Sequence, residues 1–255
     1  MPVRLIVTDL DGTLLRNDKT ISAQSVSVLT QCREAGIKVV FATGRGSNAS
    51  DMVVVSNSHF DGRVVGNGAT AFIGDNIVYR KLLSCSSVRS LLIACDAGGL
   101  KTASQLDDRD YTNFICSDVW PEHVDFEIVD FAQHDKDAEK VYVLTNSPTD
   151  VALITQHLSM EMYLVVDRVG FAMIMHREAT KAAAVAELAR IWGIDAADIV
   201  AFGDDLNDID MLNHAGVGVA MGNAVEEVKA IADYICPSNE EDGLARWLQE
   251  YVLEL

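Results

Sequence analysis

The stretch Asp9-Leu10-Asp11-Gly12-Thr13 constrains the fold most, because it directly follows the apolar run Leu5-Ile6-Val7. The run predicts a short buried strand over residues 5–8. In extended backbone, residues i and i+2 project to the same side, so Asp9 and Asp11 would point together beyond the strand end. In open α/β sheets, ligands bind outside the carboxyl ends of the strands. Two neighbouring carboxylates repel each other, and a hard, oxygen-binding cation such as Mg²⁺ would relieve that repulsion.

Short apolar runs alternate with helical patterns towards both ends of the chain. This alternation predicts an α/β fold with a doubly wound, Rossmann-like parallel sheet. The turn Gly74-Asp75-Asn76 between two apolar runs predicts a hairpin. The predicted strands are 5–8, 38–42, 63–65, 199–202 and 217–220, and the predicted helices are 22–35, 181–192, 208–214, 225–232 and 244–251.

The middle of the chain has denser polar turns and a heavier acidic load, with 7 Lys/Arg and 16 Asp/Glu in residues 83–180. Helices are predicted at 86–97 and 149–158, and strands at 140–144, 162–166 and 171–175. The short connection between the last two strands favours antiparallel pairing. Residues 107–110 and 135–139 are predicted to be exposed turns. We therefore expect an α+β domain at 82–180, inserted into a core that consists of 1–81 and 181–255.

Composition excludes several classes of partner. The net charge of −18 over 255 residues argues against binding to nucleic acid or to an anionic membrane. No apolar run approaches the roughly 18 residues that span a bilayer. The scattered cysteines favour reduced thiols in a cytoplasmic protein over disulfides or zinc. They are Cys32, Cys85, Cys95, Cys116 and Cys236. The oligomeric state is not indicated.

Three further sites carry chemistry-bearing residues. Thr43-Gly44-Arg45 follows the run at 38–42 and offers a hydroxyl, a free N–H and a guanidinium to a phosphate. When this stretch is considered alone, a strand-to-helix turn capped by Thr43 explains it equally well. Lys181 begins a predicted helix, against the preference set by the helix dipole, which points to an anionic target. A solvated surface lysine is the alternative.

The last site, Gly203-Asp204-Asp205-Leu206-Asn207-Asp208, follows the apolar strand at 199–202. An acidic helix N-terminus explains Asp205 or Asp208. It does not explain why the cluster follows so apolar a strand. Together the four sites provide carboxylates, phosphate donors, a cation and a metal cage at one rim of one sheet.

These motifs together resemble the haloacid dehalogenase superfamily, and more narrowly its Cof-type branch of Mg²⁺-dependent phosphatases with an inserted cap. Asp9–Thr13 and Ala42–Arg45 match the first two motifs, and Gly66–Ala69 resembles the Asn-Gly-Ala stretch of the family. The fourth motif matches through Asp210-Met211-Leu212 and beyond. The family usually has Lys-Gly at the third motif, where this chain has Lys181-Ala182.

The resemblance implies roles for individual residues. Asp9 would attack phosphorus and become an aspartyl-phosphate, and Asp11 would exchange protons with the leaving alcohol and with water. Mg²⁺ would bind Asp9, the main-chain carbonyl of Asp11, and Asp204. Asp208 would orient Lys181 or a metal-bound water, and whether Asp205 or Asp208 joins the metal shell stays open. The implied phosphate ligands are Thr43, the N–H groups of Leu10 and Gly44, Lys181 and Asn207.

The implied activity is hydrolysis of small phosphorylated metabolites, sugar phosphates foremost, in the cytoplasm. One alternative is a dedicated sugar-phosphate phosphatase of a biosynthetic pathway. Another is a regulatory protein that binds a phosphorylated ligand without turnover. The second carboxylate, Asp11, argues against this last reading, because binding alone needs no proton donor.

Overall fold

The computed structural model describes residues 3–47, 59–120, 125–166 and 170–253. The chain divides into two compact units, which we describe separately. We call Met1–Arg80 with Thr180–Leu255 the core unit, and Lys81–Ala179 the inserted unit.

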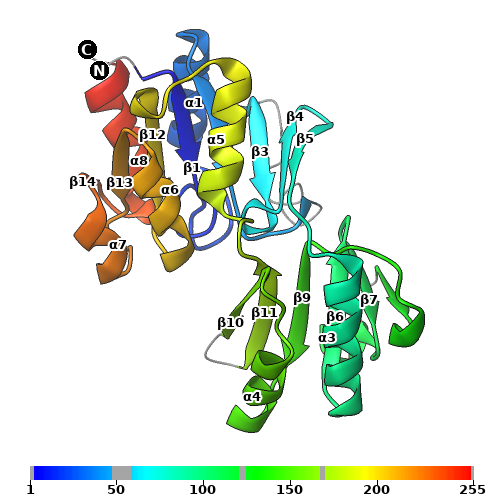
Figure 1. The fold of residues 1–255 in the computed structure, drawn as a ribbon. Helices are drawn as coiled ribbons and strands as arrows, with labels where there is room; N and C mark the ends of the chain where they lie inside the picture. The colour runs from blue at the N-terminus through cyan, green and yellow to red at the C-terminus, as the bar shows by residue number, and fades with distance from the viewer. Residues whose placement is uncertain (1–2, 48–58, 121–124, 167–169, 254–255) are drawn as a thin grey trace. The chain divides into compact units, whose positions relative to one another are not determined.

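The core unit contains an eight-stranded sheet in the order β14-β13-β12-β1-β2-β3-β4-β5 (Figure 1). The strands from β14 to β3 are parallel, and β4 and β5 add an antiparallel hairpin. The bounds are β1 Leu5–Thr8, β2 Lys38–Ala42, β3 Gly62–Val65, β4 Thr70–Ile73, β5 Asn76–Arg80, β12 Ile199–Gly203, β13 Val217–Ala220 and β14 Tyr234–Ile235.

Helices cover both faces of this sheet, as the alternation of elements predicts (Figure 1). α1 (Ala23–Glu34) and α8 (Gly243–Leu248) pack together on one face, and α5 (Lys181–Trp192) and α6 (Ile209–His214) on the other. The short α7 (Glu226–Ile231) follows β13. The doubly wound parallel sheet predicted from the sequence is confirmed.

The register of the sheet brings the first motif beside the fourth. Thr8 at the end of β1 lies opposite Phe202 of β12 and Phe41 of β2. Because the strands are parallel, the segments that follow them leave the sheet at the same edge. All four residues of β1 are buried, as expected for a strand of a parallel sheet that is covered on both faces.

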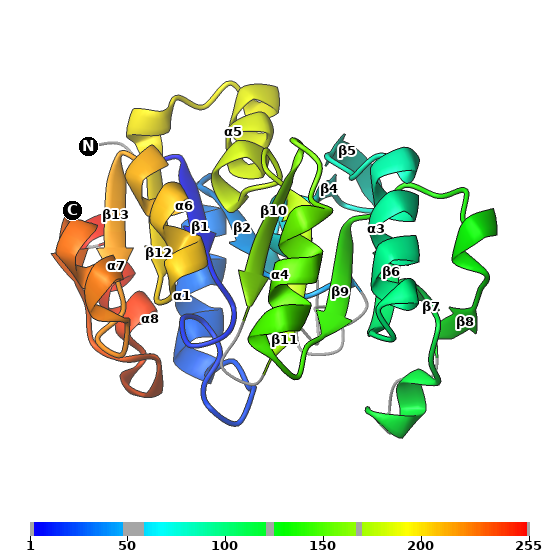
Figure 2. The same cartoon turned by 60° about the horizontal axis from the view of Figure 1, so that its bottom comes forward.

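The inserted unit is built on a six-stranded sheet in the order β10-β11-β9-β6-β7-β8. Its pairs are antiparallel except β7 with β8. α3 (Cys85–Ala97) and α4 (Pro148–Gln156) lie side by side over one face of the sheet (Figure 2). The strands are β6 Lys101–Leu106, β7 Arg109–Thr112, β8 Phe126–Ile128, β9 Lys140–Leu144, β10 Met162–Val166 and β11 Phe171–His176.

Two exposed turns were predicted in this unit, and in each of them the structure buries one of the charged residues. Asp107 and Asp108 form a turn with positive φ, but Asp110 lies within β7 and is 2% exposed. In the second turn, Glu139 is 7% exposed. The prediction was wrong at these positions because a charged residue was taken to lie in solvent, whereas Tyr142 and Gln105 donate hydrogen bonds to Asp110.

The other predicted helices and strands are present, within three residues of their expected bounds. Among the residues that the structure describes, none of the helices has the length and apolar character needed to cross a membrane.

Candidate active site

Asp9 lies at the carboxyl edge of the core sheet. Its backbone N–H donates to the carbonyl of Phe202 on the neighbouring strand, at 3.0 Å. β12 ends at Gly203, and Asp204 follows it at the same edge. The Asp9 side chain is 6% exposed, so it is an acid buried at the end of a buried strand.

Lys181 connects the first motif with the fourth. Its Nζ donates to Oδ1 of Asp9 and to Oδ1 of Asp208, both at 2.6 Å. Lys181 is 1% exposed and Asp208 is fully buried. The Thr180 hydroxyl caps α5 by accepting from the N–H of Ala183, and so fixes the helix start from which Lys181 extends. The cation that the sequence places against the helix dipole thus has two buried carboxylates as partners.

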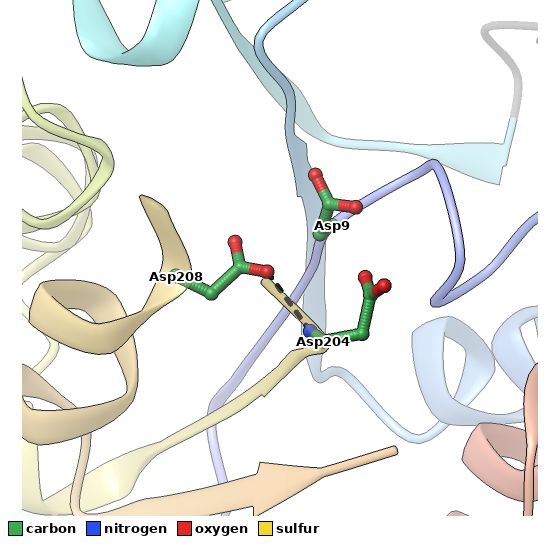
Figure 3. A group of neighbouring side chains, drawn as sticks. All are labelled: Asp9, Asp204 and Asp208. Atoms are coloured by element: carbon green, nitrogen blue, oxygen red, sulfur yellow. Dashed lines mark hydrogen bonds between the residues drawn. The ribbon is translucent and has the colours of Figure 1, made fainter. Parts of the chain in front are cut away.

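Backbone donors hold Asp208 in place. Its Oδ2 accepts from the N–H groups of Asp204 at 2.9 Å and Asp205 at 3.2 Å, and Figure 3 shows the first of these bonds. Gly203 makes this arrangement possible, because a Cβ there would lie 2.4 Å from Cβ of Asp208.

Three carboxylates gather at this point: Asp9, Asp204 and Asp208 (Figure 3). One oxygen from each lies within 4.8 Å of the others. Burial raises the pKa of Asp9 to about 7, and the Lys181 ammonium opposes that rise. Burial also raises the pKa of Asp204 to about 6, against the hydrogen bond that Thr13 donates to it.

This donor set fits a hard divalent cation. All three side chains offer oxygen. The raised pKa values of Asp9 and Asp204 mean that their buried negative charges cost free energy in the absence of a further cation. Gly12 lets the chain pass close to Asp204, because a Cβ there would lie 2.2 Å from Oδ2 of Asp204, and its φ is +81°. The acidic cluster could therefore hold a metal ion.

The Asp11 carboxylate does not belong to this cluster. The extended backbone ends at Thr8, so the i, i+2 rule does not apply to the two acids. The Asp11 carboxylate binds Arg45 instead, through Nε at 2.6 Å and Nη2 at 2.7 Å, and Lys19 Nζ at 2.7 Å. The hydrogen bond from Arg45 is the largest cause that lowers the pKa of Asp11 to about 2.

The expected phosphate ligands follow β2 and β12. Thr43 is 1% exposed, and its hydroxyl accepts from the N–H of Arg45 at 3.2 Å. Asn207 donates through Nδ2 to Oδ1 of Asn67 at 2.8 Å. A Cβ at Gly44 would lie 3.0 Å from the same Asn67 oxygen. Asn67 therefore links the second motif with the fourth.

Sequence reasoning missed the contacts of Asn67, Thr13 and Lys19. Asn67 and Thr13 lie within stretches that carry the family resemblance, so their position in those motifs was the available signal. Nothing in the sequence marks Lys19, which is one charged residue in a polar loop. Of the predicted residues, the described structure brings Asp9, Lys181 and Asp204 together with Asp208. Leu10 is fully buried in the turn beside them.

A cavity of about 350 Å³ lies in the inserted unit, among residues that include Tyr111, Asp130 and His134. None of the predicted site residues lines it. We place the candidate site at the carboxylate cluster, because that is where the buried charges meet.

Comparisons with known proteins identify the family. Residues 6–248 match the sequence model of the haloacid dehalogenase-like hydrolases. A 5-amino-6-(5-phospho-D-ribitylamino)uracil phosphatase of Bacillus subtilis strain 168 is 30% identical over 264 residues, which cover 97% of each chain. A putative phosphatase of Haemophilus influenzae is 31% identical over 274 residues, which cover 98% of each.

A solved structure agrees with these relatives. A phosphatase of the haloalkanoate enzyme superfamily from Bacteroides thetaiotaomicron superposes with a TM-score of 0.83 at 25% identity, covering 98% of this chain and 95% of that one. The chain belongs to the haloacid dehalogenase-like hydrolases. Within that family it is a phosphatase, and the resemblance to the Cof-type branch is confirmed.

Proposed function

We propose that this chain is a Mg²⁺-dependent phosphatase that hydrolyses small phosphorylated metabolites through an aspartyl-phosphate formed on Asp9. The observation that carries the proposal is the position of the Asp9 carboxylate, 2.6 Å from the Lys181 ammonium and among the oxygens of Asp204 and Asp208. Phosphoryl transfer depends mainly on positioning and on neutralising charge, and this cluster supplies both.

Asp9 acts as the nucleophile. A carboxylate oxygen attacks phosphorus in line, the P–O bond to the leaving group breaks, and the phosphoryl group is held on Asp9 until water attacks it. Lys181 lowers the pKa of Asp9 against the larger effect of burial, and so favours the ionised form of the nucleophile. Asp208 holds Lys181 in place from the other side, at 2.6 Å.

The metal site consists of Asp9, Asp204 and the main-chain carbonyl of Asp11, with Asp208 beside them. A Mg²⁺ ion held by these residues would neutralise the negative charge of the nucleophile and the phosphate. Thr13 fixes Asp204 by donating to its Oδ1 at 2.8 Å.

Asp11 exchanges protons with the reacting groups. It donates one to the leaving alcohol and later removes one from the attacking water. The phosphate oxygens are bound by donors at the ends of the same strands. These donors are Thr43, the N–H groups of Leu10 and Gly44, Lys181 and Asn207.

The substrates are small monophosphates, with sugar phosphates foremost. Residues 83–180 carry 7 Lys/Arg against 16 Asp/Glu, a net charge of −9. If this inserted unit acts as a cap, it disfavours polyanions, because like charges at short range in a dry site repel strongly. Relatives named as phosphatases of a phosphorylated ribitylaminouracil favour a second candidate, a dedicated phosphatase of a biosynthetic pathway.

The test begins with Mg²⁺-dependent release of phosphate from p-nitrophenyl phosphate. The second step compares kcat/KM for a hexose monophosphate, its bisphosphate and 5-amino-6-(5-phospho-D-ribitylamino)uracil, at low and high salt. We expect the monophosphate to exceed the bisphosphate, most clearly at low salt. Equal or better turnover of the bisphosphate at low salt would contradict the charge argument. A strong preference for the uracil compound would favour the dedicated phosphatase.

A further inference from the structure

The turn that follows β3 lies against the proposed phosphate-binding loop. β2 and β3 are parallel neighbours, so the segments that follow them leave the core sheet at the same edge. The N–H of Asn67 donates to the carbonyl of Thr43 at 2.9 Å. The N–H of Gly66 donates to the carbonyl of Arg45 at 2.8 Å. The turn therefore binds the loop on both sides of Gly44.

The first of these bonds also orients the N–H of Gly44. The Thr43 carbonyl and the Gly44 N–H belong to one planar trans peptide group, in which the two point in opposite directions. Because the carbonyl faces the N–H of Asn67, the N–H of Gly44 faces away from the turn. The backbone of Asn67 thus sets the direction of one proposed phosphate donor.

The side chain of Asn67 orients a second proposed donor, the amide of Asn207. Oδ1 of Asn67 accepts from Nδ2 of Asn207 at 2.8 Å. An amide nitrogen carries two N–H groups in one plane, so a bond that holds one of them also fixes the direction of the other. The contact with Asn67 uses one N–H of Asn207, and the second can donate to a phosphate oxygen.

The third motif packs against the same turn. Gly68 has φ +100°, and a Cβ there would lie 2.1 Å from the carbonyl oxygen of Thr180, the residue before Lys181. The turn therefore contacts three of the four motifs. It meets the second through backbone hydrogen bonds, the third through Gly68 and the fourth through the side chain of Asn67.

We propose that Asn67 is a positioning residue for the substrate phosphate, which orients the Gly44 N–H through its backbone and the Asn207 amide through its side chain. This inference rests on the proposed function, in which both groups donate to phosphate oxygens. Donors that are already held in the bound direction lose less conformational entropy when the phosphate binds. Asn67 therefore strengthens phosphate binding through the two donors that it holds.

The competing account is that Asn67 only shapes the turn. Its φ is +56°, and asparagine adopts this left-handed region more readily than most other residues. Glycine adopts it freely, so the competing account predicts that Asn67→Gly is harmless. Our proposal predicts a loss, because glycine keeps the backbone N–H but has no oxygen to accept from Asn207.

The test measures Ki for inorganic phosphate, together with kcat and KM for p-nitrophenyl phosphate, at saturating Mg²⁺. We expect Asn67→Gly to raise Ki and KM about fivefold each, because one hydrogen bond to a charged group is weakened. Its kcat should stay within about twofold, because the lost interaction is made in the ground state and in the transition state alike. An unchanged Ki, or a loss confined to kcat, would overturn the proposal.

Asn67→Ala tests the contribution of the backbone. Alanine lacks the accepting oxygen and also resists the left-handed conformation, so it should disturb the bond to the Thr43 carbonyl as well. We expect its Ki to exceed that of Asn67→Gly by at least about twofold. An Asn67→Ala variant with the same Ki as Asn67→Gly would overturn the part of the proposal that concerns Gly44.

Asp108→Gly is the matched control, because Asp108 also has a left-handed φ of +61° and lies in a turn of the inserted unit. Its Ki should equal that of the wild type, and a rise as large as in Asn67→Gly would overturn the proposal. Asn67→Asp decides the question if Asn67→Gly does not fold. Aspartate tolerates the left-handed conformation and still accepts from Asn207, but it adds a negative charge beside a phosphate donor, so Ki should rise about tenfold at low salt. An unchanged Ki in Asn67→Asp would overturn the proposal.

A double variant separates this proposal from the proposed function. Asn207→Ala should raise Ki at least as much as Asn67→Gly does. In the Asn207→Ala background, Asn67→Gly should change Ki no further, because its side chain acts through Asn207. A further rise there would overturn the proposal. If Asn207→Ala leaves Ki unchanged, the phosphate role of Asn207 is wrong and the Asn67 proposal falls with it. If Asn207→Ala raises Ki and Asn67→Gly does not, the Asn67 proposal alone falls.

Discussion

The core unit and the inserted unit both bury ionisable side chains, but they stabilise them in different ways. In the core unit, Asp9, Asp208 and Lys181 converge at one edge of a parallel sheet. In the inserted unit, Asp110 is 2% exposed, and Tyr142 and Gln105, two neutral side chains, donate to its oxygens. Two neutral side chains donate hydrogen bonds to the single carboxylate of Asp110, which the Lys140 ammonium also attracts, whereas three crowded carboxylates share Lys181.

The difference follows from strand direction. Parallel strands all end at the same edge, so side chains that follow them collect there. Antiparallel strands end at alternate edges, and their polar side chains meet across neighbouring strands instead. The buried charges of the core unit should therefore serve chemistry, and those of the inserted unit should serve stability.

The largest effect expected from this comparison concerns one buried acid in each unit, Asp9 and Asp110. Asp9→Asn should lower kcat by at least about 10⁴-fold, because it removes the nucleophile while keeping the shape of the side chain. Asp110→Asn, the matched change in the inserted unit, should keep kcat for p-nitrophenyl phosphate within about threefold. Substantial turnover by a folded Asp9→Asn protein would remove the distinction between the units.

The next effect concerns the metal. Asp204→Ala should raise the Mg²⁺ concentration needed for half-maximal activity at least about tenfold, because one of the carboxylate ligands is lost. Asp205→Ala serves as the neighbour control, since the Asp205 carboxylate accepts from the N–H of Leu206. A Mg²⁺ titration that stays unchanged in Asp204→Ala would move the ligand role to Asp205 or Asp208.

In the inserted unit the expected effect is on stability. Tyr142→Phe removes the hydroxyl that donates to Asp110 and should lower the free energy of unfolding by about 1–3 kcal/mol. Tyr251→Phe, at a tyrosine that is 40% exposed, should change it by less than about 0.5 kcal/mol. Urea unfolding measures both. A Tyr142→Phe protein as stable as the wild type would show that this buried pair does not stabilise the unit.

The smallest expected effect is a pH dependence in the core unit without metal. The folded-state pKa of Asp204 is raised by burial from 3.8 to about 6, so the folded protein holds this proton more tightly than the unfolded chain. The stability attributable to Asp204 therefore falls as the pH rises from about 4 to about 6. Asp204→Asn cannot ionise, so its stability relative to the wild type should rise by about 1 kcal/mol between pH 5 and pH 7.5 in EDTA. If the difference in stability between Asp204→Asn and the wild type does not vary with pH, Asp204 ionises as freely in the folded protein as in the unfolded chain.

The core sheet could be predicted because its strands are short apolar runs that end in turn residues. Leu5–Thr8 and Lys38–Ala42 have the predicted bounds for this reason. β6 was missed, because Lys101–Leu106 alternates polar and small residues and contains no apolar run. The burial of Asp110 was missed because its partner Tyr142 lies 32 residues away in the sequence.

The candidate site could be predicted only in part. Lys181 was identified because a cation at a helix start needs an anionic partner, and its contacts with Asp9 and Asp208 follow that logic. The pairing of Asp11 with Arg45 was not foreseen, because it depends on how the chain turns after β1 ends. The contact between Lys19 and Asp11 depends on a left-handed residue in a loop, which no pattern of residue types specifies. The chemical roles of these residues stay predictions.

The most direct test of the account is to find the phosphoryl group on the enzyme. The Asp11→Asn variant, with Mg²⁺ and p-nitrophenyl phosphate, is quenched in acid within milliseconds, and its peptides are mapped by mass spectrometry. Slower attack of water in this variant should let the intermediate accumulate. The account predicts one phosphoryl group on the peptide that contains Asp9, labile to hydroxylamine and absent from an Asp9→Asn/Asp11→Asn control. A phosphoryl group on another residue, or continued turnover with none on Asp9, would contradict it.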